Sequence, residues 1–133
     1  LLKQTDDNGI SRFMSNFQNS FTRYSNIRHE RIGQLFLDQF KAVRIETDEQ
    51  LLHVSRYIHL NPYSSFMVKT LEDLQNYPWS SLPEYLEQKE SGLCNTKMVL
   101  SLANGKQEYK NFLFSQADYQ RELEKIKHLI LEQ

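Results

Sequence analysis

The sequence predicts an α+β fold in which helices predominate. Apolar residues recur at the 3.6-residue spacing of an amphipathic helix in three stretches, around residues 10–26, 48–60 and 118–130. Residues 40–46 are instead rich in β-branched and aromatic side chains, which favours a strand. A chain of 133 residues is long enough for a single modest core.

The first helix is expected to follow Asn8, a residue type that caps helix N-termini. Its apolar face is assigned to the core and carries Ile10, Phe13, Met14, Phe17, Phe21 and Tyr24. Its polar face offers hydrogen-bond donors suited to phosphate oxygens, at Arg12, Asn16, Asn19 and Arg23. A basic loop ended by Gly33 comes next, with Arg28, His29 and Arg31.

In the expected strand, Lys41, Arg44 and Glu46 keep charge off one face. A bulge or bend is expected near Asp38 and Gln39. The strand leads directly into the second helix, so helix, strand and helix form the predicted core unit.

The sequence marks both the start and the end of this second helix. Thr47 is expected to cap its start with Gln50 reaching back, and the acids Asp48 and Glu49 suit the positive end of the helix dipole. Pro62 is expected to end it, with the last turn closing near Leu60.

The two faces of this helix differ in chemistry. The core stripe is expected at Leu51, Val54 and Ile58. A polar edge runs at steps of four through His53, Tyr57 and Asn61. From the residues alone two interpretations stay open. Tyr57 is either a nucleophile beside a metal or phosphate ligand at Asn61, or a rim residue beside a helix terminator.

His53 and His59 are not expected to form a ligand pair, because residues six apart on a helix point to nearly opposite sides. His59 is therefore expected at the surface or in a cap, and His53 beside Tyr57.

Short helices are expected beyond Pro62. Thr70 has capping-box chemistry, and one turn of helix is expected from Pro83 to Glu87. Trp79 is expected to close the edge of the core, with base stacking as the alternative. A helix after Thr96 should break at Asn104 and Gly105, and Asp118 should cap the last helix, residues 118–130.

Charge is distributed unevenly. The net charge of the whole chain is −1. Residues 8–45 hold six Lys or Arg against two acids, a balance of +4, so the remainder holds ten against fifteen, a balance of −5. The charges of the first third therefore form either a basic surface for a polyanion or ordinary solvated surface, and both interpretations stay open from charge alone. The lone Cys94 fits a reducing, cytoplasmic location, and no apolar run reaches membrane-spanning length.

Several separated motifs agree with one known family. These are Gly-Gln-Leu-Phe at 33–36, Phe-Lys-Ala-Val-Arg-Ile at 40–45, Arg-Tyr-Ile-His-Leu-Asn-Pro at 56–62 and Tyr-Pro-Trp-Ser-Ser at 77–81. In this order they resemble the REP-associated tyrosine transposases, which are single-tyrosine, insertion-sequence-type enzymes of the HUH endonuclease superfamily. The resemblance runs from Leu1 to about Tyr85.

The resemblance implies roles and a fold. Tyr57 matches the catalytic tyrosine, and Asn61 matches the carboxamide that completes a Mg²⁺ or Mn²⁺ site with two histidines. The His-hydrophobic-His motif that would supply those histidines is absent, together with a preceding helix and two strands. Residues 1–87 are therefore expected to be the C-terminal part of a ferredoxin-like HUH transposase domain, and residues 88–133 a helical extension.

The resemblance further implies single-stranded or hairpin DNA as partner, contacted by Arg12, Arg23, Arg28, His29, Arg31, Lys41 and Arg44. Without the paired histidines, this chain alone is expected to hold no metal and to be inactive in strand cleavage. A homodimer that covers an exposed sheet edge is a further expectation. The alternatives are a DNA-binding module without catalysis and a helical protein-interaction domain.

Overall fold

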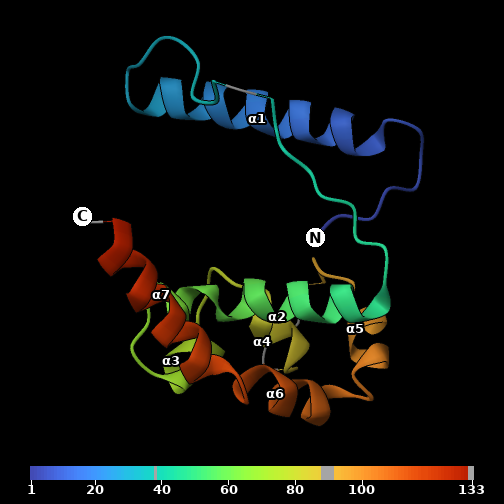
Figure 1. Ribbon diagram of the computed structural model, residues 1–133. Helices are drawn as coiled ribbons and strands as arrows, with labels where there is room; N and C mark the ends of the chain where they lie inside the picture. The colour runs from blue at the N-terminus through green and yellow to red at the C-terminus, as the bar shows by residue number, and fades with distance from the viewer. Residues whose placement is uncertain (38, 88–91, 132–133) are drawn as a thin grey trace. The chain divides into compact units, whose positions relative to one another are not determined.

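The structure is a computed structural model that describes residues 1–37, 39–87 and 92–131. Within these residues the chain is predominantly helical, as the sequence predicts, and contains no β-strand (Figure 1). Two compact units divide the chain, Leu1–Arg44 and Ile45–Gln133. No described helix is both long and apolar enough to cross a bilayer.

The first unit is built on α1, Gly9–Arg28. Asn8 occupies the predicted N-cap position in the left-handed region, with φ of 58°, and its side chain makes no cap hydrogen bond. The amide of Gly9 donates instead to the carbonyl of Asp6 at 3.0 Å. The predicted helix is therefore present, but its start is stabilised by a backbone turn.

The aromatic face of α1 is not buried, and its assignment to the core is wrong for the described residues. No residue of α1 is buried, and Phe13, Phe17 and Phe21 are 50%, 52% and 47% exposed. Apart from α1 the described part of this unit is irregular chain, which is too small to cover a face 20 residues long. Only Phe36 extends the ring row, with its centroid 6.3 Å from that of Phe21.

The predicted strand at residues 40–46 does not form. Residues 39–46 have no regular secondary structure. A strand is stabilised by backbone hydrogen bonds to a neighbouring strand, and the described residues offer none. Of the bend expected at Asp38 and Gln39, Asp38 lies outside the described residues.

α2, Asp48–Ser64, is the central helix of the second unit. It packs against α3 (Leu71–Gln75), α5 (Lys97–Leu102), α6 (Lys106–Phe114) and α7 (Ala117–Leu131), and α3 packs against α4 (Leu82–Tyr85) (Figure 1). The fully buried apolar side chains are Leu60, Leu74, Leu82, Tyr109 and Leu113. Residues on both sides of the predicted boundary at 87/88 thus share one core, while the division into 1–87 and 88–133 stays a prediction.

The start of α2 agrees with the predicted cap. Thr47 Oγ1 accepts from the amide of Gln50 at 3.1 Å, and Asp48 and Glu49 lie in the first turn. Gln50 Oε1 reaches back one residue further than expected and accepts from the amide of Glu46 at 2.8 Å. Two otherwise free N–H groups are satisfied in this way.

The end of α2 differs from the prediction, because the helix continues through Pro62 to Ser64. Proline removes one helical hydrogen bond, at a cost of about 3 kcal/mol. Burial of Leu60 and Tyr63 on the core offsets this cost, at about 1.5–3 kcal/mol per large side chain. The Pro62 carbonyl also accepts from the amide of Val68 at 3.0 Å. The core thus overrides the local stop signal.

The later helices follow the predicted pattern, although the turn of helix expected from Pro83 to Glu87 is found at Leu82–Tyr85. Thr70 and Asp73 form a capping box at α3, and the break before α6 falls at Asn104 and Gly105, which have φ of 60° and 110°. Trp79 is 85% exposed, so its assignment as a core plug is wrong.

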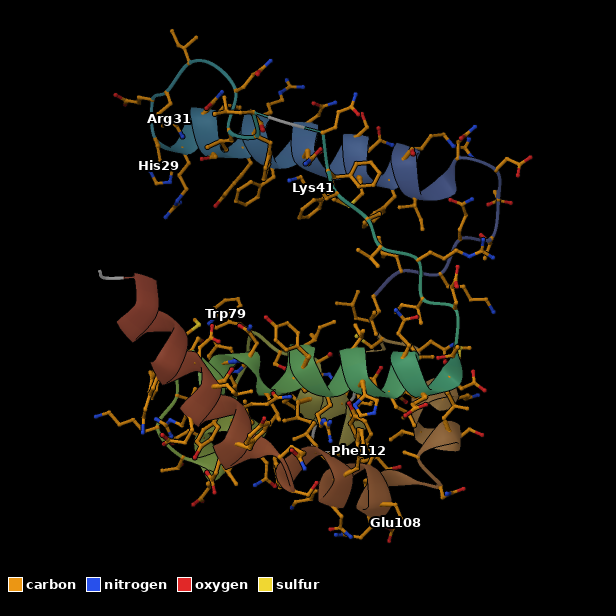
Figure 2. All side chains as sticks on the ribbon, viewed as in Figure 1. His29, Arg31, Lys41, Trp79, Glu108 and Phe112 are labelled. Atoms are coloured by element: carbon orange, nitrogen blue, oxygen red, sulfur yellow. The ribbon has the colours of Figure 1, made fainter. Side chains whose placement is uncertain are left out.

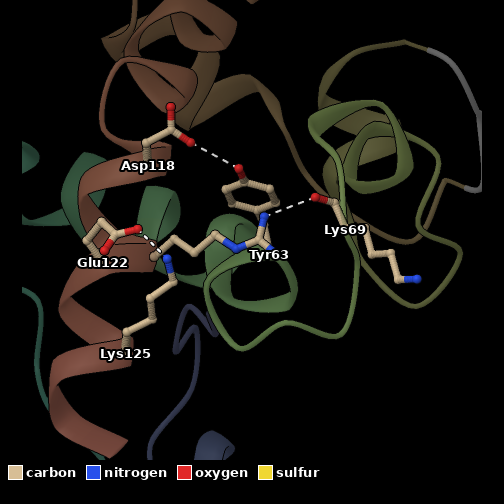
Figure 3. Close-up of polar contacts among 6 residues, drawn as sticks. Tyr63, Lys69, Asp118, Glu122 and Lys125 are labelled. Atoms are coloured by element: carbon tan, nitrogen blue, oxygen red, sulfur yellow. Dashed lines mark hydrogen bonds and ion pairs between the residues drawn. The ribbon is translucent and has the colours of Figure 1, made fainter. Parts of the chain in front are cut away.

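Asp118, the predicted cap of α7, lies inside the first turn instead, because α7 begins at Ala117. Its carboxylate accepts from the Tyr63 hydroxyl at 3.0 Å (Figure 3). Arg121 of the same helix stacks on the rings of Tyr63 and Phe66, 4.2 and 4.7 Å from their centroids, and donates to the Lys69 carbonyl at 2.9 Å. These contacts fasten α7 to the end of α2.

Candidate functional site

The residues predicted to contact DNA all lie in the first unit. Each is exposed: Arg12, Arg23, Arg28, His29, Arg31, Lys41 and Arg44. Three of them are on α1, where no acidic residue occurs, and the others follow it along the chain. The structure therefore presents this set to solvent within one unit.

A short turn shapes the basic loop after α1. The amide of Arg31 donates to the Asn26 carbonyl at 2.9 Å, and Asn26 Nδ2 donates to the Gly33 carbonyl at 2.8 Å. Gly33 has φ of 105°, a conformation that favours glycine. His29 and Arg31 project from this turn, and Lys41 lies on the irregular chain beyond it (Figure 2).

The two units carry opposite net charges. Leu1–Arg44 contains seven Lys or Arg and four Asp or Glu, a balance of +3. Ile45–Gln133 contains nine and thirteen, a balance of −4. Opposite charges on the two units concentrate the attraction for a polyanion on the first.

Tyr57 and Asn61 lie one turn apart on α2, in the second unit. Tyr57 is 54% exposed and Asn61 is exposed. Among the described residues, neither the Tyr57 hydroxyl nor the Asn61 carboxamide has a hydrogen-bond partner. A free, exposed hydroxyl one turn from a free carboxamide is what the expected roles require, and an ordinary surface tyrosine has the same environment.

Asn61 brings a single carboxamide oxygen to the expected metal site. In the ranges 1–37, 39–87 and 92–131, no three His, Cys, Asp or Glu side chains come together to hold a metal ion. One carboxamide oxygen is a poor site for Mg²⁺, which demands octahedral geometry and dehydrates reluctantly.

His53 faces its own helix and α6 rather than Tyr57. Its Nδ1 lies 2.9 Å from an Arg56 nitrogen, its Nε2 lies 3.8 Å from a Glu49 oxygen, and its ring meets Phe112 edge-on at 5.7 Å. No hydrogen bond joins it to Tyr57 in the described structure. The expected influence of His53 on the Tyr57 proton stays a prediction, because no described hydrogen bond connects the two side chains.

His59 is buried, so its expected place at the surface is wrong. It is 2% exposed and lies at the centre of a polar chain. Its Nδ1 is 2.8 Å from Tyr109 Oη, its Nε2 is 2.8 Å from Ser81 Oγ, and Tyr109 Oη is 2.6 Å from Ser55 Oγ. A neutral imidazole has one donor and one acceptor, so both ring nitrogens of His59 are satisfied in either direction of the chain.

Burial dominates the protonation of this polar chain. It lowers the pKa of His59 to about 4, so the ring is neutral at pH 7. Burial likewise raises the pKa of Tyr109, which stays a phenol, and Tyr85 packs edge-on against His59 at 4.6 Å. A neutral, fully bonded histidine in a packed core holds helices together.

Sequence reasoning missed this polar chain, although the spacing of two of its members indicates that they share a helix face. Ser55 and His59 are four residues apart and therefore share a face with Leu52 and Tyr63. Of the expected stripe, Leu51 packs against the core, whereas Ile58 is 41% exposed. The partners on α4 and α6 are distant in sequence and could not be paired without the structure.

Comparison of the chain with protein-family models, with curated proteins and with solved structures finds no match in any of the three.

Proposed function

We propose that this chain is a DNA-binding protein of the transposase type. Its basic unit, Leu1–Arg44, contacts single-stranded or hairpin DNA, and Tyr57 acts as the nucleophile in strand cleavage and transfer. The observation that carries the proposal is the exposed, basic character of the first unit, which contrasts with the net charge of −4 in the second. The motif resemblance described above adds the choice of Tyr57 and Asn61.

In the proposed reaction the Tyr57 oxygen bonds to phosphorus and the bond from phosphorus to the 3′ oxygen breaks. The strand is left as a 5′-phosphotyrosine ester, and the leaving 3′ oxygen takes up a proton as the phenol loses one. The exposed hydroxyl of Tyr57 is accessible for this attack. The reaction needs a divalent cation to offset the charge of the phosphate, so the proposal assigns no cleavage to this chain alone.

A second candidate, a DNA-binding module without catalysis, rests on the same basic unit. It requires neither a nucleophile nor metal ligands. Binding tests do not separate the two candidates, whereas a covalent adduct does.

DNA binding is tested by fluorescence anisotropy with labelled single-stranded and hairpin DNA. Arg28→Glu with Arg31→Glu should weaken binding to all sequences, because both side chains are exposed cations of the basic unit. For single strands, the slope of log K against log salt is negative. Each lost phosphate contact should reduce its magnitude by about 0.7.

The matched control is Lys69→Glu with Lys97→Glu, which changes the net charge equally but in the second unit, at exposed positions. This pair should weaken binding much less. Equal losses in both double variants would mean that net charge alone acts, and absence of binding at low salt would refute the proposal.

A further inference from the structure

α1 carries a row of exposed rings at regular spacing. The centroids of Phe13 and Phe17 are 6.1 Å apart with 11° between the ring planes, and those of Phe17 and Phe21 are 6.3 Å apart with 18° between them. Phe36 continues the row beyond Phe21, and Tyr24, 59% exposed, follows on the same helix. Single exposed apolar residues are common on protein surfaces, whereas a contiguous row of rings is typical of a binding face.

Hydrogen-bond donors occupy a neighbouring face of α1, about a third of a turn around the helix from the ring row. They are spaced at steps of four, three and four, which places them on one side of the helix: Arg12, Asn16, Asn19 and Arg23. Arg28 lies one turn beyond Tyr24, in line with the rings, and all five are exposed. α1 has three arginines and no acidic residue. An occupant with flat apolar groups on one side and negative charge on the other matches these two faces.

We infer that the aromatic face of α1 is a stacking platform for single-stranded DNA, with bases on the rings and phosphates toward Arg28 and the neighbouring donor face. Bases follow one another at about 3.4 Å along a strand, so two steps span about 6.8 Å, close to the observed ring spacing. Every second base of a continuous strand can thus meet one ring. Base–aromatic stacking needs no particular sequence, since every base has a π-face.

The inference rests on the proposed function. It assigns DNA binding to one face of α1, which the charges alone do not identify. A basic patch binds duplex and single strands alike, whereas a ring platform requires unpaired bases. A second copy of α1 is a poorer occupant, because two copies of this helix carry six arginines between them and no acid to pair with them.

The test uses the whole chain with Phe17→Leu and Phe21→Leu, which keep an apolar side chain but remove the π-face. No residue of α1 is buried, so neither variant removes a core contact, and circular dichroism checks that the helix is retained. Affinity for a single-stranded oligothymidine should fall about 5-fold or more per ring. Affinity for a duplex of equal length should be unchanged.

Three controls separate stacking from other causes. The salt slope should be the same in the variants as in the original chain, because no charge is removed. Phe17→Tyr should keep the affinity, since it keeps the ring. Tyr119→Leu, at a 62% exposed position of α7, should have no effect.

Unchanged oligothymidine affinity in Phe17→Leu, with the loss in the Arg28 and Arg31 variant intact, would overturn the platform and leave the proposed function standing. Sedimentation that shows a dimer in the original chain and a monomer in Phe17→Leu, without a change in DNA affinity, would also overturn it in favour of an interface between copies. No nucleic-acid binding at low salt would refute both proposals.

Discussion

His59 and Tyr57 are two residues apart on α2 and have opposite environments. His59 is 2% exposed and fully hydrogen-bonded, whereas Tyr57 is 54% exposed with a free hydroxyl. Their spacing on the helix places them on different sides, so one serves the core and the other faces solvent. A substitution of His59 should therefore change the stability of the fold, whereas a substitution of Tyr57 should change the proposed chemistry.

Acid should destabilise the fold through His59. Its pKa is lowered to about 4 in the folded chain from an ordinary value of 6.5. The unfolded chain thus binds the proton first, so stability is full above about pH 6.5 and falls as pH drops toward 4. The difference corresponds to a loss of about 3 kcal/mol in the free energy of unfolding. Urea denaturation at a series of pH values between 7 and 4.5 measures it.

His59→Gln retains hydrogen-bonding capacity without titrating and should flatten this pH dependence. His53→Gln, at a half-exposed position outside the polar chain, is the matched control and should leave it intact. If His59→Gln loses as much stability between pH 7 and 4.5 as the original chain, the loss belongs to other groups.

Cleavage should be absent from this chain with Mg²⁺ or Mn²⁺, because Asn61 alone does not hold the cation that a phosphotyrosine-forming reaction needs. A chain extended upstream with a segment bearing a His-hydrophobic-His motif should form a covalent protein–DNA adduct, detected by its reduced mobility on a denaturing gel. In the extended chain, Tyr57→Phe should abolish the adduct and leave DNA affinity within a factor of about two, since stacking and charge are unchanged. Asn61→Ala should slow adduct formation more than it weakens binding.

An adduct that persists in Tyr57→Phe would assign the nucleophile to another tyrosine, with Tyr24 and Tyr63 next to be tested. Tyr24 is 59% exposed, whereas Tyr63 is buried and donates to Asp118, so Tyr24 has the more accessible hydroxyl. Strong cleavage by the present chain would contradict the argument from the metal site.

Two helices show what sequence patterns establish and what they leave open. For α2 the cap at Thr47 is local chemistry and was predictable, whereas continuation through Pro62 depends on burial of Tyr63 against residues far along the chain. For α1 the periodicity predicts the helix correctly, but periodicity does not say whether a face has a partner. The same limit applies to residues 40–46, whose strand pattern lacks a neighbouring strand in the described chain.

At the scale of the molecule, the sequence predicts the predominance of helices, the segregation of charge and the helix caps at Thr47 and Thr70. It does not predict the buried polar chain, because His59 meets Ser81 and Tyr109 only once α4 and α6 pack against α2. The candidate nucleophile and the candidate DNA-binding residues also fall into separate units, which no local pattern reveals. Net charge is a sum over residues and does not depend on tertiary contacts. It is therefore the most direct link from the sequence to the proposed function.

The central claim, that DNA binds the first unit, is tested most directly by an NMR titration of isotopically labelled full chain with a single-stranded oligonucleotide. A chain of 15.9 kDa gives a resolved amide spectrum that reports each residue separately. Amide shifts should change along α1 and through the loop at residues 29–33, in proportion to added DNA, with small effects in the core of the second unit. Shifts confined to Ile45–Gln133, or none at low salt, would contradict the account.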